Sequence, residues 1–167
     1  GDFTWSDVSF TEPKTNARQR RQTGTVRTGE KGGYFVDIFR SSRKDGNDKK
    51  HEYLFHSQGE PLVLTDFEGT LLETKETGEL SSAKGDLAGY DYFTDKKEAP
   101  SNDHFIARFR MPGFSNNHLK VNLWMKGEEG RTIFAVKSLY SRAIHPESVP
   151  EALYHKVVKN GRGNFEE

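Results

Sequence analysis

The sequence predicts an all-β protein, an antiparallel and supersandwich-like β-sandwich with little helix. Apolar residues come in short runs that alternate with polar residues at a period of two, as half-buried strands require. Clusters of Gly, Pro, Asn and Asp separate these runs, and no segment keeps a 3.6-residue apolar stripe over three turns. Because a chain of 167 residues suits one core, we expect a single β-sandwich domain over residues 1–167.

Five segments follow the strand pattern most closely. Tyr34–Arg40 carries apolar side chains on both faces, which is typical of a central strand covered on two sides. Phe105–Met111 instead gathers most of its large apolar side chains on one face. Turn sequences such as KDGND, PGFSNN and GEEGR lie between the runs. We therefore predict strands at Tyr34–Arg40, His51–His56, Phe105–Met111, Val121–Met125 and Ile133–Val136.

Three further segments follow the pattern less closely. Residues 73–87 are polar and rich in Gly, Ser and Thr, which predicts a long polar loop. The first ten residues, GDFTWSDVSF, predict an edge strand, and the C-terminal LYHKVVKNGRGNF predicts another strand. We expect unpaired edges at both segments, through which two copies of the chain could associate.

The bulk composition excludes several classes of protein. Lys plus Arg and Asp plus Glu each number 25, so the formal net charge is zero and favours neither nucleic acid nor an anionic membrane as a partner. Without cysteine there is no disulfide, no thiolate nucleophile and no Cys-ligated zinc. No apolar run approaches the roughly 20 residues of a membrane helix. Because the first residue is Gly rather than Met, we expect a piece trimmed from a longer protein.

His51 and His56 are the first candidates for metal binding or acid–base chemistry. Five residues separate them, so on one strand they point to opposite faces and do not converge on one ion. The other histidines are scattered, without carboxylates at metal-ligand spacing. We therefore expect no metal site and no cofactor in this chain.

Aromatic side chains are candidates for sugar binding. A flat ring stacks on the C–H face of a pyranose, while nearby Arg, Lys or Asn side chains hydrogen-bond hydroxyls or a uronate. Trp124 shares a strand face with Asn122 and Lys126, and Tyr90 and Tyr92 lie in the segment AGYDYF. Packing in the core is the alternative for each ring.

Basic side chains form a third group of candidates. Arg40 ends a predicted buried strand and needs a partner there, for which Asp37 and Glu52 are available. The run Arg18–Gln22, RQRRQ, suits either contact with phosphate or an anionic sugar or the solvated end of a strand.

A series of motifs runs through the chain in a fixed order. GGYFVDIFR is followed by HEYLFHSQG, then by LAGYDYFTDKKEAPSNDHFIARFRM, LKVNLWMKGEEGRTIFAVKS and ALYHKVVKNGRGNF. In order and spacing they resemble the C-terminal β-sandwich portion of the heparinase II/III-like polysaccharide lyases, including its histidine-bearing strand and its GRT-x-F strand. The resemblance extends from about Arg18 to the C-terminus.

The resemblance implies a division of labour. Lyases of this family are carbon–oxygen lyases that cleave uronate-containing polysaccharides, glycosaminoglycans among them, by β-elimination. A Tyr or His base removes the C5 proton while Asn, His or Arg neutralises the carboxylate. In the family these groups belong mostly to an N-terminal helical toroid, and a His/Asp metal site lies early in the β region. The sequence contains neither segment, so the resemblance implies a module that is inactive alone.

Three functions stay open on these grounds. The first is a module of a secreted or periplasmic polysaccharide lyase, with the missing toroid of the same protein and an acidic polysaccharide as partners, and with neither nucleic acid nor a membrane. The second is a free-standing carbohydrate-binding sandwich. The third is a small hydrolase or lyase using His51 and Tyr53, which share a strand face. The substrate-binding candidates are His51, Tyr53, Arg40, Trp124, Tyr90 and Tyr92.

Overall fold

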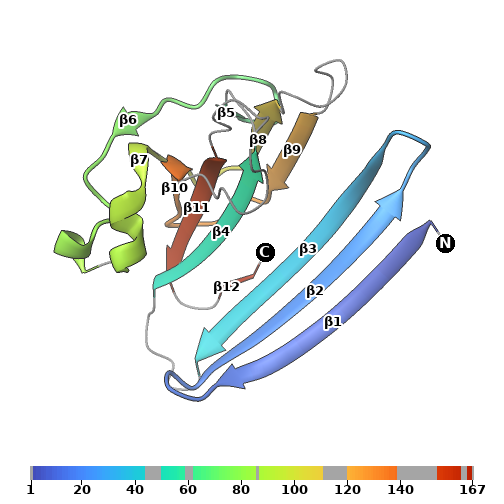
Figure 1. The fold of residues 1–167 in the computed structure, drawn as a ribbon, viewed down its shortest axis with the longest axis horizontal. Coiled ribbons are helices and arrows are strands. Elements are labelled where there is room, and N and C mark those ends of the chain that lie inside the picture. Colours follow the sequence, from blue (N-terminus) through green and yellow to red (C-terminus); the bar gives the residue numbers. More distant parts are fainter. Residues whose placement is uncertain are drawn as a thin grey trace, which may run out of the picture. The chain divides into compact units, whose positions relative to one another are not determined.

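The computed structural model describes residues 2–43, 50–58, 62–85, 87–110, 120–138, 154–162 and 165–166. Its strands pair in antiparallel fashion wherever a register is described, and its helices are two short 3-10 segments, η1 (Ser82–Lys84) and η2 (Ala88–Tyr92). The prediction of an all-β, antiparallel fold is confirmed (Figure 1). The strands are β1 (Phe3–Glu12), β2 (Ala17–Arg27), β3 (Gly33–Arg43), β4 (Lys50–Gln58), β5 (Leu62–Thr65), β6 (Lys75–Glu76), β7 (Thr94–Pro100), β8 (Phe105–Arg110), β9 (Lys120–Met125), β10 (Thr132–Ser138), β11 (Tyr154–Arg162) and β12 (Phe165–Glu166).

The five predicted strands correspond to β3, β4, β8, β9 and β10, and Met111 lies outside the described residues. The N-terminal edge strand is confirmed as β1. Within residues 73–87 the described part is mostly irregular, with only β6 and η1 in it. The expectation of an unpaired C-terminal edge is wrong for β11, which lies between β4 and β10. Its partner β4 is about 100 residues earlier in the chain, and local alternation carries no information on such pairing.

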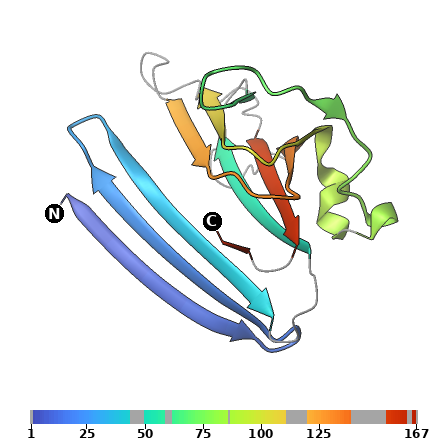
Figure 2. The same ribbon diagram turned by 180° about the vertical axis from the view of Figure 1, so that it is seen from behind.

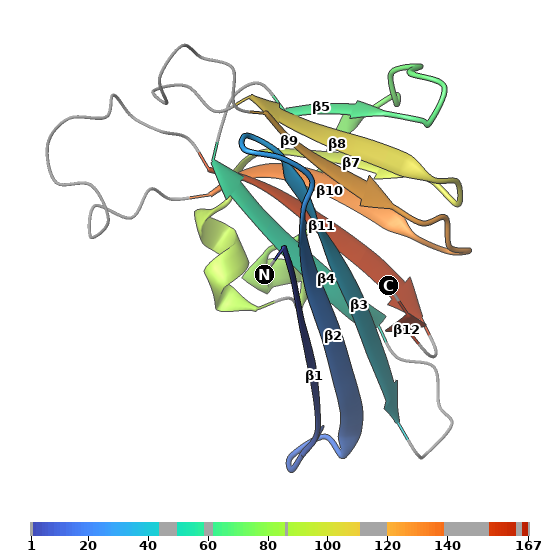
Figure 3. The same cartoon turned by 90° about the vertical axis from the view of Figure 1, so that its right-hand side faces the viewer.

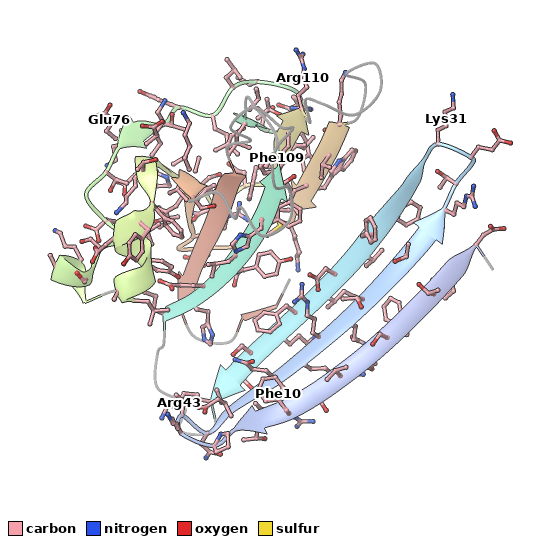
Figure 4. The ribbon with its side chains drawn as sticks, in the orientation of Figure 1. Phe10, Lys31, Arg43, Glu76, Phe109 and Arg110 are labelled. Carbon is pink, nitrogen blue, oxygen red and sulfur yellow. The ribbon has the colours of Figure 1, made fainter. Side chains whose placement is uncertain are left out.

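The chain divides into two compact units, residues 1–51 with 161–167, and residues 52–160. This division into units does not test whether the chain forms a single domain, which stays a prediction. The first unit contains a sheet of order β1-β2-β3-β12, in which short turns join three long strands. The Glu12 carboxylate closes the β1–β2 turn by accepting hydrogen bonds from the backbone N–H groups of Lys14 and Thr15. Side chains stand on both faces of these strands, Phe10 among them (Figure 4).

The second unit is a two-layer sandwich. Its layers are a five-stranded sheet of order β4-β11-β10-β7-β6 and a three-stranded sheet of order β5-β8-β9 (Figure 3). Alternation directs Phe109 of β8 into the core between them and its neighbour Arg110 outward (Figure 4). The buried residues of this core are Leu64, Ala99, Phe105, Ala107, Phe109, Met125 and Ile133.

A second apolar cluster covers the other side of the five-stranded sheet. The two 3-10 helices lie beside β7 and β10 (Figure 2) and bring Leu80, Tyr90 and Phe93 onto Phe134 and Val136 of β10. Since Ile133 of the same strand faces the first core, β10 is buried on both faces. This explains the nearly continuous apolar run TIFAV in its sequence.

One buried cation ties together the turns at one end of the sandwich. Arg131, which is 1% exposed, precedes β10. Its guanidinium donates hydrogen bonds to the backbone carbonyls of Ser101, Lys126 and Asp103. It also lies over the ring of Phe105, with Cζ 4.8 Å from the ring centroid. The β7–β8 and β9–β10 connections are therefore held by one side chain.

We expect Arg131→Met to lower the free energy of unfolding by at least about 3 kcal/mol. Each buried acceptor that loses its donor costs about 1–3 kcal/mol, and the substitution strips three carbonyls. Urea unfolding monitored by far-UV circular dichroism measures the loss. Arg110→Met, at an exposed position of β8, is the matched control and should change stability by no more than about 0.5 kcal/mol. Equal stability of the two variants would contradict a clamping role for Arg131.

Candidate functional site

The outer face of the three-stranded sheet combines aromatic and basic side chains. Along β9, Val121, Leu123 and Met125 pack into the sandwich, so the intervening Asn122 and Trp124 point outward and are exposed. The cross-strand register places Ile106 opposite Trp124 and extends the same face across β8 and β5. The outer face consists of Val63, Thr65, Ile106, Arg108, Arg110, Lys120, Asn122 and Trp124, of which Thr65 and Ile106 are buried.

Trp124 lies at one end of this face in a cluster of three rings. Phe67 stacks on His104, with centroids 5.0 Å apart and planes at 26°. Phe67 also meets Trp124 edge to face, with centroids 5.7 Å apart. Trp124 nevertheless stays 65% exposed and Phe67 49% exposed. The neighbouring rings therefore hold Trp124 in place while most of its surface contacts solvent.

A tight turn after β5 presents Phe67. The Asp66 N–H donates to the Thr70 carbonyl at 2.9 Å, and one Asp66 carboxylate oxygen accepts from the Thr70 N–H at 2.7 Å. Gly69 adopts φ +96°, a conformation that a residue with Cβ takes at a cost. The sequence TDFEGT thus encodes a closed turn with Phe67 at its tip.

The β9–β10 turn fixes His104 beneath Phe67. His104 Nδ1 accepts a hydrogen bond of 2.7 Å from the Gly127 N–H, and Asn102 Oδ1 accepts one of 3.0 Å from the Gly130 N–H. A Cβ at position 127 would lie 2.6 Å from the Asn102 carbonyl oxygen, so only glycine allows this approach. Arg131 closes the same turn, and its burial lowers its pKa, an effect that the nearby Glu128 carboxylate opposes.

The other end of the face is basic. Arg110 and Lys120 are directly opposite each other across β8 and β9, and both are exposed. Like charges at such a position destabilise a sheet, and an anion between them would remove the repulsion. Next to them Arg108 is opposite Asn122 and donates a hydrogen bond to the Thr65 hydroxyl. The outward positions of β5, β8 and β9 include no carboxylate.

This arrangement suits one kind of ligand. Trp124 offers a flat apolar surface, Asn122 an amide, and Arg110 with Lys120 a pair of cations, all on one sheet face. A chain of sugar rings that carries carboxylates or sulfates would meet a complementary group at each point.

The structure does not group the predicted aromatic residues. Tyr90 is buried, its ring stacks on Phe93, and its hydroxyl donates to Glu52 Oε2 at 2.6 Å. It is thus a core residue, the alternative that the sequence left open. Tyr92 is exposed on η2, outside the five-stranded sheet, whereas Trp124 is outside the three-stranded sheet. One ligand on either layer therefore cannot contact both.

The remaining predicted residues are less exposed. Tyr53 of β4 packs against the sandwich core. His51 is half-buried and His56 is exposed, as their opposite orientations predict. Arg40 of β3 is half-buried and donates to Gln22 Oε1 at 2.7 Å. Its expected partner Asp37 accepts two hydrogen bonds from Arg21. A role of these residues in substrate binding stays a prediction.

A cleft of about 650 Å³ lies elsewhere in the second unit, where β5 begins and β10 ends. Two of its cations already have partners, because Lys137 pairs with Asp95 at 2.7 Å and Lys96 donates to the Leu80 carbonyl. We therefore place the candidate site on the outer face of the three-stranded sheet. In the described part of the chain, no three His, Cys, Asp or Glu residues gather as metal ligands would, and no helix is long and apolar enough to cross a membrane.

Sequence analysis missed several residues of this face. Phe67, His104, Arg110 and Lys120 were not among the candidates, although TDFEGT signals a turn that exposes an aromatic residue. Arg110 and Lys120 are opposite each other only because of the register between β8 and β9, which are joined by nine residues. Alternation within each strand does not determine that register.

Comparison with known proteins relates this chain to the polysaccharide lyases. The relative is an endo-acting ulvan lyase from Formosa agariphila, 36% identical over 98 residues, which are 57% of this chain. The chain covers 12% of the length of that enzyme. No protein-family model matches the chain, and no solved structure matches it.

We expect Gly127→Ala to disturb the ring cluster and to lower the free energy of unfolding by about 1–3 kcal/mol, because the added methyl group meets the Asn102 backbone. Thermal unfolding measures stability, and the emission maximum of Trp124 in a Trp5→Phe background reports the cluster. Gly89→Ala is the matched control, since nothing lies within 4 Å of a Cβ there. If both variants behave like the parent, the turn does not position the cluster.

Proposed function

We propose that this chain is the β-sandwich module of a heparinase II/III-like polysaccharide lyase. The observation that carries the proposal is the similarity to an ulvan lyase in a chain that folds as antiparallel sheets. The order of the sequence motifs supports the narrower assignment. The parent protein would be a carbon–oxygen lyase that cleaves a uronate-containing polysaccharide, a glycosaminoglycan or a related acidic glycan.

In this proposal the module supports catalysis without performing it. Tyr53, which with His51 formed the catalytic pair of the third candidate function, is partly buried and packs against the sandwich core. The base and the carboxylate-neutralising group would belong to a helical toroid elsewhere in the same protein. The module itself would need no cofactor, and the parent would be secreted or periplasmic.

The module would contact the polysaccharide through the outer face of β5, β8 and β9. Trp124 would stack on a sugar ring, while Arg110 and Lys120 would bind a carboxylate or sulfate further along the chain. The repulsion between those two cations supports an acidic rather than a neutral glycan.

A free-standing carbohydrate-binding module is the second candidate. The exposure of Trp124, at 65%, favours it, because a large ring is left in solvent while its edges are held by Phe67. The two candidates share the same glycan surface and differ in whether the parent protein cleaves the bound chain.

Two measurements test these proposals. Incubated with ulvan or heparan sulfate, the isolated chain should generate no unsaturated uronate absorbance, while the protein extended to its natural length should. Activity of the isolated chain would contradict the supporting role. An extended protein that binds polysaccharide without cleaving it would favour the free-standing binding module.

We expect Trp124→Ala to weaken binding of the isolated chain to an acidic polysaccharide about tenfold, which corresponds to about 1.4 kcal/mol. Affinity electrophoresis in a gel containing the polysaccharide measures this change. Tyr92→Ala is the matched control, because Tyr92 is as exposed, at 63%, but lies on the other layer. Equal losses from the two substitutions would contradict a specific role for the outer face.

A further inference from the structure

The first sheet has two chemically different faces. The register aligns Trp5 with Gly24 and Val36, and Asp7 with Gln22 and Ile38. One face thus carries the odd-numbered residues of β1 and the even-numbered residues of β2 and β3. We call it the Trp5 face.

The ring of Trp5 lies against Gly24 of the neighbouring strand β2. A Cβ built at Gly24 would lie 2.7 Å from Trp5 Cε3 and 2.9 Å from Cζ3, so the ring occupies the place of a side chain at position 24. Gly24 is consequently buried, although Trp5 stays 47% exposed. The ring of Phe3 follows it, nearly parallel at 18° with centroids 6.5 Å apart. The sheet therefore presents two aligned rings with a free outer surface.

A fixed row of polar groups continues from Trp5 on the same face. Asp7 accepts hydrogen bonds from Arg20 Nε at 2.9 Å and from Gln22 Nε2 at 3.0 Å, and Gln22 Oε1 accepts one from Arg40. The bond from Arg20 lowers the pKa of Asp7, so this carboxyl group is ionised at neutral pH. These side chains are ordered before any ligand binds, which reduces the entropy that binding costs.

The Trp5 face is also basic and long. Arg18 is exposed and forms no ion pair within the part of the chain that the structure describes. Across β1–β3, this face carries Arg18, Arg20 and Arg40 against the carboxylate of Asp7, and the register places Glu166 of β12 opposite Arg40. From Gly24 to Arg18 the strand extends for about 20 Å, at about 3.3 Å per residue. A ligand that uses both ends must be an extended anionic chain.

The opposite face suits a different partner. Val8, Phe10 and Phe39 line a depression of about 290 Å³ there, and the arginine of that region, Arg21, is paired with Asp37. The centre of a protein–protein interface contains few charged residues. This apolar face therefore resembles a protein-binding surface more than the Trp5 face does.

We propose that the Trp5 face is a second carbohydrate-binding surface, which binds an extended acidic glycan by stacking sugar rings on Trp5 and Phe3 and pairing acidic groups with Arg18 and its neighbours. The basic run RQRRQ would then take part in glycan binding, because its alternate members Arg18, Arg20 and Gln22 lie on this face. The surface belongs to the first unit and is independent of the Trp124 surface assigned above.

Tryptophan fluorescence tests the proposal directly, because the chain contains two tryptophans, Trp5 and Trp124. In a Trp124→Phe variant all tryptophan emission comes from Trp5. Titration with a uronate hexasaccharide should change this emission saturably, whereas cellohexaose at the same concentrations should change it at least about tenfold less. The reciprocal Trp5→Phe variant reports the Trp124 surface in the same titration.

Two further variants in the Trp124→Phe background test the named residues. Arg18→Gln should weaken the acidic ligand about fivefold and reduce the salt dependence of binding. Arg21→Gln, on the opposite face of the same strand, should leave affinity within about twofold. Gly24→Ala should abolish the response by displacing the Trp5 ring, although alanine is otherwise better than glycine inside a strand.

The possible outcomes separate this inference from the proposed function. If only Trp124 responds, the Trp5 surface is refuted and the proposed function stands. If only Trp5 responds, the second surface is supported and the assignment to Trp124 falls. Equal responses to the neutral and acidic sugars refute the acidic specificity. Trp5 emission that varies with protein concentration but not with glycan shows a contact between copies and also refutes the proposal.

Discussion

The candidate surface on the sandwich depends on one buried guanidinium. Arg131 satisfies three backbone carbonyls in two connections, residues 101–104 and 126–131. Those connections carry Asn102, His104 and Gly127, whose contacts place the ring under Phe67. A lysine could not make the same set of bonds, because its ammonium group lacks the planar fork of donors. The orientation of the exposed Trp124 thus depends on a cation that is itself buried in the interior.

The two exposed tryptophans are held by different means with the same result. Trp124 meets the ring of Phe67 edge to face, whereas Trp5 lies on the bare backbone of Gly24. In both, part of the ring is fixed by protein and the rest stays in solvent. A tryptophan side chain without protein contacts loses rotamer freedom when it binds a ligand. A tryptophan that already packs against protein has lost that freedom on folding, so binding costs less entropy. Glycine within a strand weakens the sheet slightly, so its presence under Trp5 is best understood as making room for the ring.

Local sequence pattern predicted the fold class and several of its strands, because alternation at a period of two follows directly from backbone geometry. It did not predict β2, β5 or β7. The pattern also placed Trp124 on one strand face with Asn122 and Lys126, from the alternation of VNLWMK, but left core packing open for this ring. It did not reveal that Tyr90 is buried, since a 3-10 helix sets that orientation and its core partner Phe134 is over 40 residues away. Nor did it place β11 between β4 and β10. Both features depend on contacts between residues distant in sequence, which periodicity does not contain.

The formal net charge of zero favours neither nucleic acid nor an anionic membrane as a partner, but it describes a sum over the whole chain. At physiological ionic strength charges are screened beyond about 8 Å, so a bound polyanion senses mainly the residues near it. Arg110 and Lys120 face each other on a sheet surface whose strands place no carboxylate outward, while acidic residues such as Asp95 and Glu98 neutralise lysines elsewhere. Because side chains alternate along a strand, the two faces of a sheet can differ in net charge. The resulting local electrostatic potential is not visible in the composition of the whole chain. For a β-protein of balanced charge, the sign of the charge on each sheet face is therefore a better guide to its ligand than the net charge of the chain.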